Sequence, residues 1–183
     1  MALKDKKATT AESHLRKAVQ QYPKYPAAWV TLGQMLAARQ QTAEARHACF
    51  QASAADSSYL PSYLCLADIA VRGQDWDEVL KLSSRALELD PTSDAVAYGY
   101  NAVANLNLHR LSEAEKSALK ASEIDKNNSD PRVHFLLAQI YEAKGDPANE
   151  AAQLREYLKF ASDPSDAAMV KQYLADLEKR TAK

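Results

Sequence analysis

The sequence repeats itself, and this repeat constrains the fold more than any other feature. One series of small residues steps by 34, 34 and 35 residues: Ala18, Ala52, Ala86 and Ala121. A second series in the same register steps by 34, 35 and 36 residues: Gly33, Ala67, Ala102 and Ala138. An aromatic series lies four residues ahead of the second one: Trp29, Tyr63 and Tyr98. Repeats of this length indicate supersecondary units that stack on one another.

Composition indicates that each unit is helical. Hydrophobic residues make up 46% of the chain, and there are only four glycines among its 183 residues, which disfavours an architecture rich in tight β-turns. Two helices joined by a short turn approach closely only where side chains are small, so Gly33 is expected to face Ala45, and Ala67 to face Val79. No such hairpin buries its apolar face alone, so neighbouring hairpins must stack.

The order of these residues resembles the tetratricopeptide repeat (TPR) of bacterial type. The resemblance is clearest in the segment Trp29-Val30-Thr31-Leu32-Gly33 and in Tyr63 with Leu66-Ala67. It implies an all-α fold, a right-handed α-solenoid of about four TPR-like helical hairpins with an N-terminal helix and a C-terminal capping helix. The third unit departs from the pattern at Asn101 and Asn105, and Gln74 and His109 stand where the inter-helix glycine is usual.

We expect one domain over residues 1–183, with the N-terminal helix at 9–22, repeats at 26–59, 60–94, 95–130 and 131–163, and the capping helix at 165–181. The expected hairpins are 26–39/42–55, 60–72/75–89, 94–108/111–124 and 131–144/147–161, the last lengthened by an insertion near Pro147. Thr92 or Ser93, and Ser165 or Asp163, are expected helix caps. Residues 9–22 resemble the second half of a hairpin, so the chain either begins with a capping helix or is a fragment; residues 165–181 look like a natural end.

Charge and cysteine content narrow the function. The net charge is −1, with basic and acidic residues interspersed, which disfavours nucleic acid as a partner. No apolar run is long enough to span a bilayer, so the chain as written is expected to be soluble, cytoplasmic or periplasmic. Cys49 and Cys65 fall inside expected helices among apolar neighbours, and we interpret them as reduced core residues.

Motifs for catalysis or cofactor binding are absent from the sequence. The histidines never pair at a metal-ligand spacing: His14, His47, His109 and His134. There is no phosphate-binding glycine loop and no nucleophile elbow. Paired acids such as Asp75 with Asp77-Glu78 occupy first helical turns, where a carboxylate favours the helix dipole. We therefore expect no enzyme activity, no metal and no cofactor.

The TPR resemblance implies a partner-binding groove lined by the first helix of each hairpin. Counting from the start of each unit places these residues on it: Val30, Gln34, Ala37, Leu64, Asp68, Arg72, Gly99, Val103, Leu106, Arg132, Phe135, Gln139 and Glu142. The Lys and Asn with which some family members clamp a C-terminal carboxylate are missing from the corresponding positions. An apolar floor with polar edges would instead suit an amphipathic helix or an extended apolar peptide.

Two functional hypotheses remain open at this stage. The first is a non-catalytic scaffold that binds a peptide or a partner protein in the concave groove. The alternative is a structural, self-associating spacer module of a larger multidomain envelope protein, with homo-oligomers formed through the ends of the solenoid. Charge and notches in the groove would favour the first, and an exposed apolar terminal face would favour the second.

Overall fold

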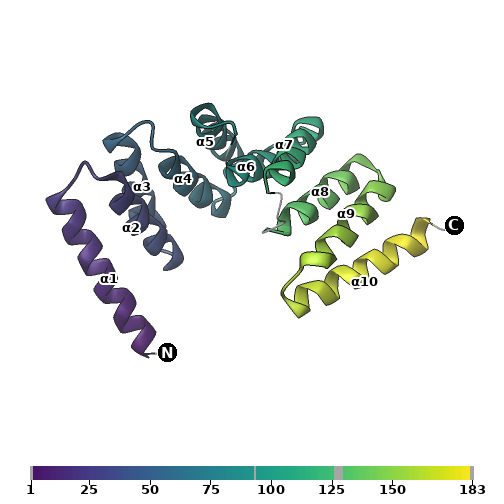
Figure 1. The fold of residues 1–183 in the computed structure, drawn as a ribbon, viewed down its shortest axis with the longest axis horizontal. Coiled ribbons are helices and arrows are strands. Elements are labelled where there is room, and N and C mark those ends of the chain that lie inside the picture. The colour runs from purple at the N-terminus through teal and green to yellow at the C-terminus, as the bar shows by residue number, and fades with distance from the viewer. Residues whose placement is uncertain (1, 93, 126–129, 182–183) are drawn as a thin grey trace. The chain divides into compact units, whose positions relative to one another are not determined.

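The computed structural model describes residues 2–92, 94–125 and 130–181, with side chains from Thr9 onward. Within these ranges the chain forms ten α-helices and no strand, which confirms the all-α prediction (Figure 1). The helices form two compact units, Met1–Pro91 and Thr92–Lys183, which are described in turn. The expectation of a single domain over residues 1–183 stays a prediction.

The first unit contains two hairpins preceded by one helix. Its helices are α1 (Ala2–Gln21), α2 (Pro26–Ala38), α3 (Thr42–Ala55), α4 (Leu60–Arg72) and α5 (Trp76–Leu89). Helices α2 and α3 form the first hairpin, α4 and α5 form the second, and α1 packs against α2 (Figure 1). The first helix begins at Ala2, so its expected start at residue 9 is wrong: the Lys-rich segment before Thr9 favours helix without contributing to the repeat pattern.

The second unit contains two further hairpins and a final helix. Its helices are α6 (Ala95–Asn107), α7 (Leu111–Ile124), α8 (Arg132–Lys144), α9 (Pro147–Phe160) and α10 (Pro164–Thr181). Helix α6 pairs with α7, α8 pairs with α9, and α10 packs against α9. The expected insertion near Pro147 is wrong, because α8 and α9 are joined by a turn as tight as the others. The extra residues of the longer repeats precede α6 and α8.

The small-residue series lies where helices meet. Ala52, Ala67, Ala86 and Ala102 are fully buried, and an ideal Cβ on Gly33 would lie 3.2 Å from the carbonyl oxygen of Ala45. Van der Waals attraction falls steeply with distance, so the short approach that these residues permit strengthens the packing of every surrounding atom. The expected facing of Gly33 and Ala45 is confirmed.

The aromatic series anchors the segments that precede the hairpins. The indole nitrogen of Trp29 donates a hydrogen bond to the carbonyl oxygen of Pro23 over 2.9 Å. One repeat later, the hydroxyl of Tyr63 donates to the carbonyl oxygen of Ser57, again over 2.9 Å. In both cases the ring spans six residues back to the loop before its own helix. Each ring therefore packs its apolar body and satisfies a loop carbonyl with its polar tip.

All four hairpin turns use the same backbone geometry. The turn residue has a left-handed conformation in each: Gln40 (φ 61°), Gln74 (φ 56°), His109 (φ 57°) and Gly145 (φ 71°). The next backbone N–H donates to a carbonyl five residues earlier, for example from Asp75 to Ala70 over 3.0 Å and from Asp146 to Tyr141 over 2.9 Å. This is the Schellman pattern of helix C-termini, and its bonds hold non-glycine residues in a conformation that they otherwise avoid.

Aspartates cap the N-termini of four described helices, α5, α6, α9 and α10. Asp75 accepts a hydrogen bond from the backbone N–H of Glu78 over 3.2 Å, and Asp94 accepts from Val96 and Ala97. Asp163 accepts from Ser165 and Asp166, as expected for the last helix. The expected cap at Thr92 is wrong because Asp94 holds that position, and Ser93 lies outside the described residues.

The polar residues of the third repeat satisfy one another inside the unit. The side-chain amide of Asn105 donates to the side-chain oxygen of Asn101 over 2.9 Å, and the hydroxyl of Ser117 donates to the same oxygen over 2.8 Å. All three side chains are buried. A buried amide is tolerated when it is hydrogen-bonded, so α6 and α7 pair as the helices of the other hairpins do.

The packing of the small residues predicts a contrast between two alanines. Leucine at Ala86, which is fully buried, must push helices apart and should lower the free energy of unfolding by roughly 1–3 kcal/mol. Leucine at Ala38, which is exposed at the end of α2, should change it by less than about 0.5 kcal/mol. Urea unfolding of both variants measures the difference. Equal midpoint shifts would show that the small-residue series does not mark the helix contacts.

The hairpin turns predict opposite effects for two substitutions of Gln74. Glycine adopts its left-handed conformation without steric cost, so Gln74→Gly should be neutral or stabilising by up to about 1 kcal/mol. Valine is the poorest residue for this conformation, so Gln74→Val should destabilise by at least about 1 kcal/mol. Thermal unfolding of the two variants tests this order. A more stable valine variant would contradict the assigned turn geometry.

Candidate functional site

The first helices of consecutive hairpins lie side by side in each unit, α2 with α4 and α6 with α8 (Figure 1). Nine of the predicted groove residues, all of them at least partly accessible, define two surfaces. The α2–α4 face consists of Gln34, Leu64, Asp68 and Arg72, and the α6–α8 face consists of Gly99, Val103, Leu106, Arg132 and Gln139. Each face is continuous with the core of its own unit.

Two of the predicted groove residues are core residues in the structure. Val30 is 5% exposed and Ala37 is 7% exposed. Helix α4 packs against α2, and the carbonyl oxygen of Val30 lies 4.0 Å from the sulfur of Cys65. A partner has no access to either side chain, so we remove both from the predicted groove.

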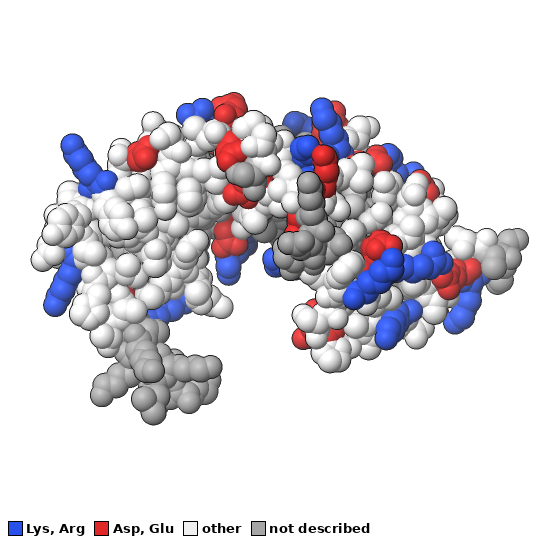
Figure 2. Space-filling model, viewed as in Figure 1, with Lys and Arg blue, Asp and Glu red and all other residues white. Residues whose placement is uncertain are grey.

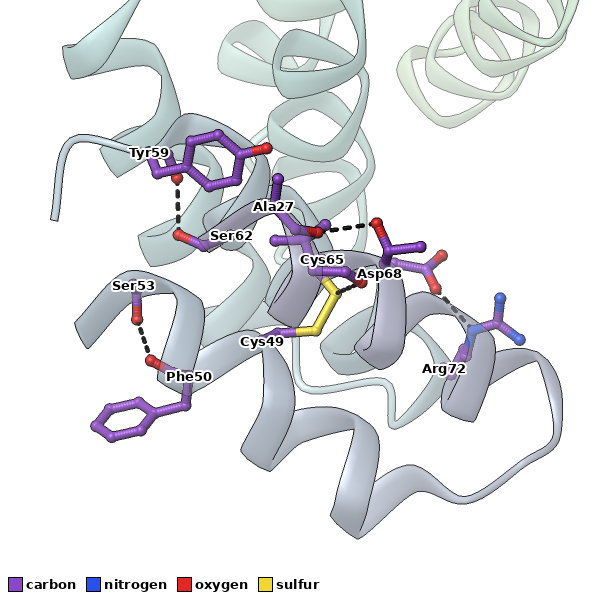
Figure 3. The surroundings of a disulfide bond; sticks show 11 residues. Ala27, Cys49, Phe50, Ser53, Tyr59, Ser62, Cys65, Asp68 and Arg72 are labelled. Carbon is purple, nitrogen blue, oxygen red and sulfur yellow. Dashed lines mark hydrogen bonds and ion pairs between the residues drawn. A yellow bond between two sulfur atoms is a disulfide. The ribbon is translucent and has the colours of Figure 1, made fainter. Parts of the chain in front are cut away.

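The α2–α4 face combines an apolar side chain with an ion pair. Leu64 is half-buried, and one turn further along α4 the guanidinium Nε of Arg72 lies 2.9 Å from a carboxylate oxygen of Asp68 (Figure 3). Both charged side chains remain substantially exposed to solvent. An exposed pair of this kind stabilises a helix by only a few tenths of a kcal/mol, roughly 0.3–0.5. A charged partner can therefore compete for either group at little cost to the fold.

The α6–α8 face contains a glycine that the packing of its unit does not require. An ideal Cβ built on Gly99 meets no described atom within 4 Å, whereas one on Gly33 would overlap the sulfur of Cys49. Glycine within a helix costs roughly 0.5–1 kcal/mol relative to alanine. The space over Gly99 is open, and an absent side chain there lets another backbone approach α6 closely.

Val103 and Leu106 of the same face are in part core residues and in part accessible. Both are half-buried and pack against a cluster that includes Ala102, Leu136 and Leu137. The part of each side chain that remains accessible lies on the α6–α8 face. These two residues therefore hold α6 against α8 and also supply apolar surface.

The α6–α8 face includes one charged residue, Arg132, which forms an ion pair with Asp130 at the start of α8. The guanidinium of Arg132 donates to both carboxylate oxygens of Asp130, over 2.7 and 2.6 Å. Hydrogen bonding to Arg132 holds the pKa of Asp130 below its ordinary value, so the carboxylate is ionised at neutral pH. The Arg132 side chain is 85% exposed, so the pair sits at the surface. Elsewhere, basic and acidic side chains are interspersed on the face that Figure 2 shows.

In the fourth repeat, two predicted groove residues, Phe135 and Glu142, lie near side chains of α9 and α10. The Phe135 ring lies 5.7 Å from the Tyr157 ring and packs against a cluster that includes Val170 of α10. Tyr173 of α10 donates a hydrogen bond to Glu150 over 2.5 Å. Burial, that bond and the nearby Glu142 carboxylate raise the pKa of Tyr173 well above its ordinary value. Phe135 therefore belongs largely to the interface with the capping helix α10, and Glu142 is an exposed residue close to Tyr173.

The described residues include no cluster of metal-ligating side chains. No group of three His, Cys, Asp or Glu side chains among them is arranged to hold a metal ion. A hollow of about 280 Å³ formed by α1, α2 and α3 is lined in part by Arg16, Trp29 and His47, and Arg16 is already paired with Glu12 and Glu44. None of the helices in the described ranges has the length and apolarity that a membrane span needs.

The expectation of reduced cysteines is wrong. Cys49 of α3 and Cys65 of α4 are buried, as expected, but they are joined in a disulfide (Figure 3). Their Cα atoms lie 5.9 Å apart because α3 of one hairpin packs directly against α4 of the next. The sequence holds one signal for this pairing: the small-residue series has glycine, not alanine, in the only repeat whose second helix carries a cysteine.

The position of Phe135 generates a prediction about stability. Replacing Phe135 by serine removes a ring from a packed cluster and should lower the free energy of unfolding by about 2 kcal/mol or more. Leu64→Ser, at a half-buried position on the α2–α4 face, should cost clearly less. Chemical denaturation followed by circular dichroism measures both. If Leu64→Ser were the more damaging variant, the assignment of the α2–α4 face would be wrong.

Comparison with solved structures shows the same fold at low sequence identity. A thermophilic TPR protein of Thermus thermophilus shares 19% identity over 93% of this chain and 90% of its own, with a TM-score of 0.72. A TPR protein of Parabacteroides merdae shares 14% identity over 98% of this chain and 70% of its own, with a TM-score of 0.77. YrrB, a TPR protein with an unusual peptide-binding site, shares 15% identity over 87% and 82%, with a TM-score of 0.69.

Sequence comparison identifies the same family directly. Residues 2–64 and residues 118–167 each match a sequence profile of the tetratricopeptide repeat, and the two segments together span more than half of the chain. No curated protein sequence matches the chain significantly. The profiles cover parts of both units, and the hairpins between them have the same helix lengths and turn geometry. The chain belongs to the tetratricopeptide-repeat family.

Proposed function

We propose that this chain is a non-catalytic scaffold that binds a peptide or a segment of a partner protein on the first helices of its hairpins. Membership of the TPR family supports a role in protein interaction in general. The observation that carries the finer proposal is Gly99, a helical glycine with open space above it at a predicted groove position. A residue that weakens its own helix and fills no packing need is suited to close approach of a second backbone.

The residues around Gly99 indicate the kind of segment that fits. Val103 and Leu106 supply apolar surface, and Arg132 and Gln139 supply polar groups at the edge of the α6–α8 face. On the α2–α4 face, Leu64 has the same role beside Asp68 and Arg72. An amphipathic helix or an extended segment with alternating apolar side chains matches this mixture. The Lys and Asn clamp for a C-terminal carboxylate is missing from the corresponding positions, so an internal segment is favoured. YrrB is itself described by its peptide-binding site, which is consistent with this use of the fold.

The proposal predicts that Gly99→Ala separates stability from binding. Alanine favours the helix, so the variant should be more stable by about 0.5–1 kcal/mol. The added methyl group occupies the open space, so affinity for a peptide selected on the wild-type chain from a displayed library should fall at least about fivefold, or roughly 1 kcal/mol. Calorimetric titration and thermal unfolding measure the two effects.

Gly73→Ala is the matched control, because a Cβ there meets only ordinary contacts and the position lies outside the α6–α8 face. This control should leave affinity unchanged. If Gly99→Ala is stabilising yet binds the peptide as the wild type does, the partner uses a different surface. If Gly99→Ala left the free energy of unfolding unchanged, Gly99 would not destabilise α6, and the argument from its cost would be wrong.

Self-association is the second candidate function, and one observation favours it. Met169 of α10 is 66% exposed, which places apolar surface on the last helix of the chain. If α10 forms an interface between copies, sedimentation should show a concentration-dependent dimer that Met169→Lys abolishes. A monomer at all concentrations would leave the binding scaffold as the supported function.

A further inference from the structure

The disulfide connects two consecutive repeats. Cys49 lies on the second helix of the first hairpin and Cys65 on the first helix of the next, 16 residues further along the chain (Figure 3). Cys49 is 0% exposed and Cys65 is 4% exposed. They are the only two cysteines of the chain, so no other intramolecular pairing competes. Apart from the peptide chain itself, stacked repeats are held by non-covalent contacts between neighbours, so this bond adds a cross-link that the later repeats, which have no cysteine, lack.

Gly33 shows that the first repeat accommodates the disulfide. A Cβ on Gly33 would overlap the sulfur of Cys49 and lie 3.2 Å from the sulfur of Cys65. In the next three repeats the position of Gly33 is occupied by alanine, and the position of Cys49 is occupied by Ser83, Ala118 and Leu154. Glycine and cysteine thus occur together, in the one repeat where the absent side chain leaves room for the two sulfur atoms.

We propose that Cys49, Cys65 and Gly33 form an oxidation-dependent lock between the first two repeats, and that the chain works in an oxidising compartment. Closure is a thiol–disulfide exchange. One cysteine thiolate attacks a small or protein disulfide oxidant and releases one of its thiols, and the second cysteine then displaces the other. The two protein thiols are oxidised to the disulfide, and the oxidant takes up the two electrons and two protons as two thiols.

Burial of the disulfide determines how fast a reductant can open it. A reductant must reach a sulfur atom in line with the S–S bond, and both sulfur atoms are enclosed by α2, α3 and α4. Reduction therefore requires the unit to open first, so the bond is long-lived in the folded chain. Buried disulfides of this kind persist in secreted, periplasmic and lumenal proteins, and the reducing cytosol keeps most thiols free. The lock is distinct from the proposed binding faces, since both cysteines are buried.

The first test uses the unaltered chain, produced by export to an oxidising compartment. Thiol titration in denaturant should find no free thiol before reduction and both after it. Reduction should raise the equilibrium constant for unfolding on the order of a hundredfold, because a closed loop of this length restricts the unfolded chain. Under native conditions, reduction by dithiothreitol should be slow and should accelerate when urea is added. Two free thiols in the exported protein, or the same urea midpoint with and without reductant, would overturn the proposal.

The second test isolates the role of Gly33. Gly33→Ala should strongly destabilise the oxidised chain and leave a fraction of its thiols unpaired. In the Cys49→Ala/Cys65→Ala background the same change should be tolerated, so the two effects on the unfolding constant should differ at least about tenfold. Equal effects in both backgrounds would show that Gly33 serves only helix packing and would contradict the lock. If Gly33→Ala does not fold in the oxidised form, its free thiols are still counted in denaturant, and unpaired thiols support the proposal while complete pairing contradicts it.

Discussion

The close contact between two helices at a position without a large side chain is the interaction on which the rest of this structure depends. Ala67, Ala86 and Ala102 have no accessible surface, and Gly33 meets the backbone of the facing helix. At these points the backbones approach until only small residues fit, and larger neighbours fill the space around them. The turn geometry sets how the two helices of a hairpin are joined, and the aromatic hydrogen bonds hold the loop before the hairpin. Both are compatible with this close approach of the helices.

The fold was largely predictable because this contact leaves a periodic trace in the sequence. The small residues recur in every hairpin, so the bounds of α2 to α10 lie within one residue of their expected positions. Features that depend on which individual side chains meet do not recur from repeat to repeat, so they leave no periodic trace. The hydrogen bonds among Asn101, Asn105 and Ser117, and the disulfide of Cys49 and Cys65, depend on which side chains meet across an interface. The repeat pattern predicts which helices pack together, but not which hydrogen bonds or disulfides form between them.

The candidate site was predictable only in part, for a related reason. Counting along a repeat identifies the first helix of each hairpin, but accessibility depends on what packs beside it. Val30 is covered because α4 crosses it, and Phe135 is engaged because α10 packs on the last hairpin. The residues that remain accessible are those that no neighbouring helix covers, and the open space over Gly99 is one such place. The sequence alone does not show that the space over Gly99 is open, because that depends on the positions of the surrounding side chains.

The central claim of the proposed function is that a partner binds the accessible side of the first helices, α2, α4, α6 and α8, and not the second helices of the hairpins. Hydrogen–deuterium exchange with and without a selected peptide tests it most directly, because it reports on every helix at once. The account predicts that the peptide increases protection in the first helices of the unit that binds it, α2 and α4 or α6 and α8, and leaves α3, α5 and α7 unchanged. Protection confined to α3, α5 and α7, or to α10, would contradict it.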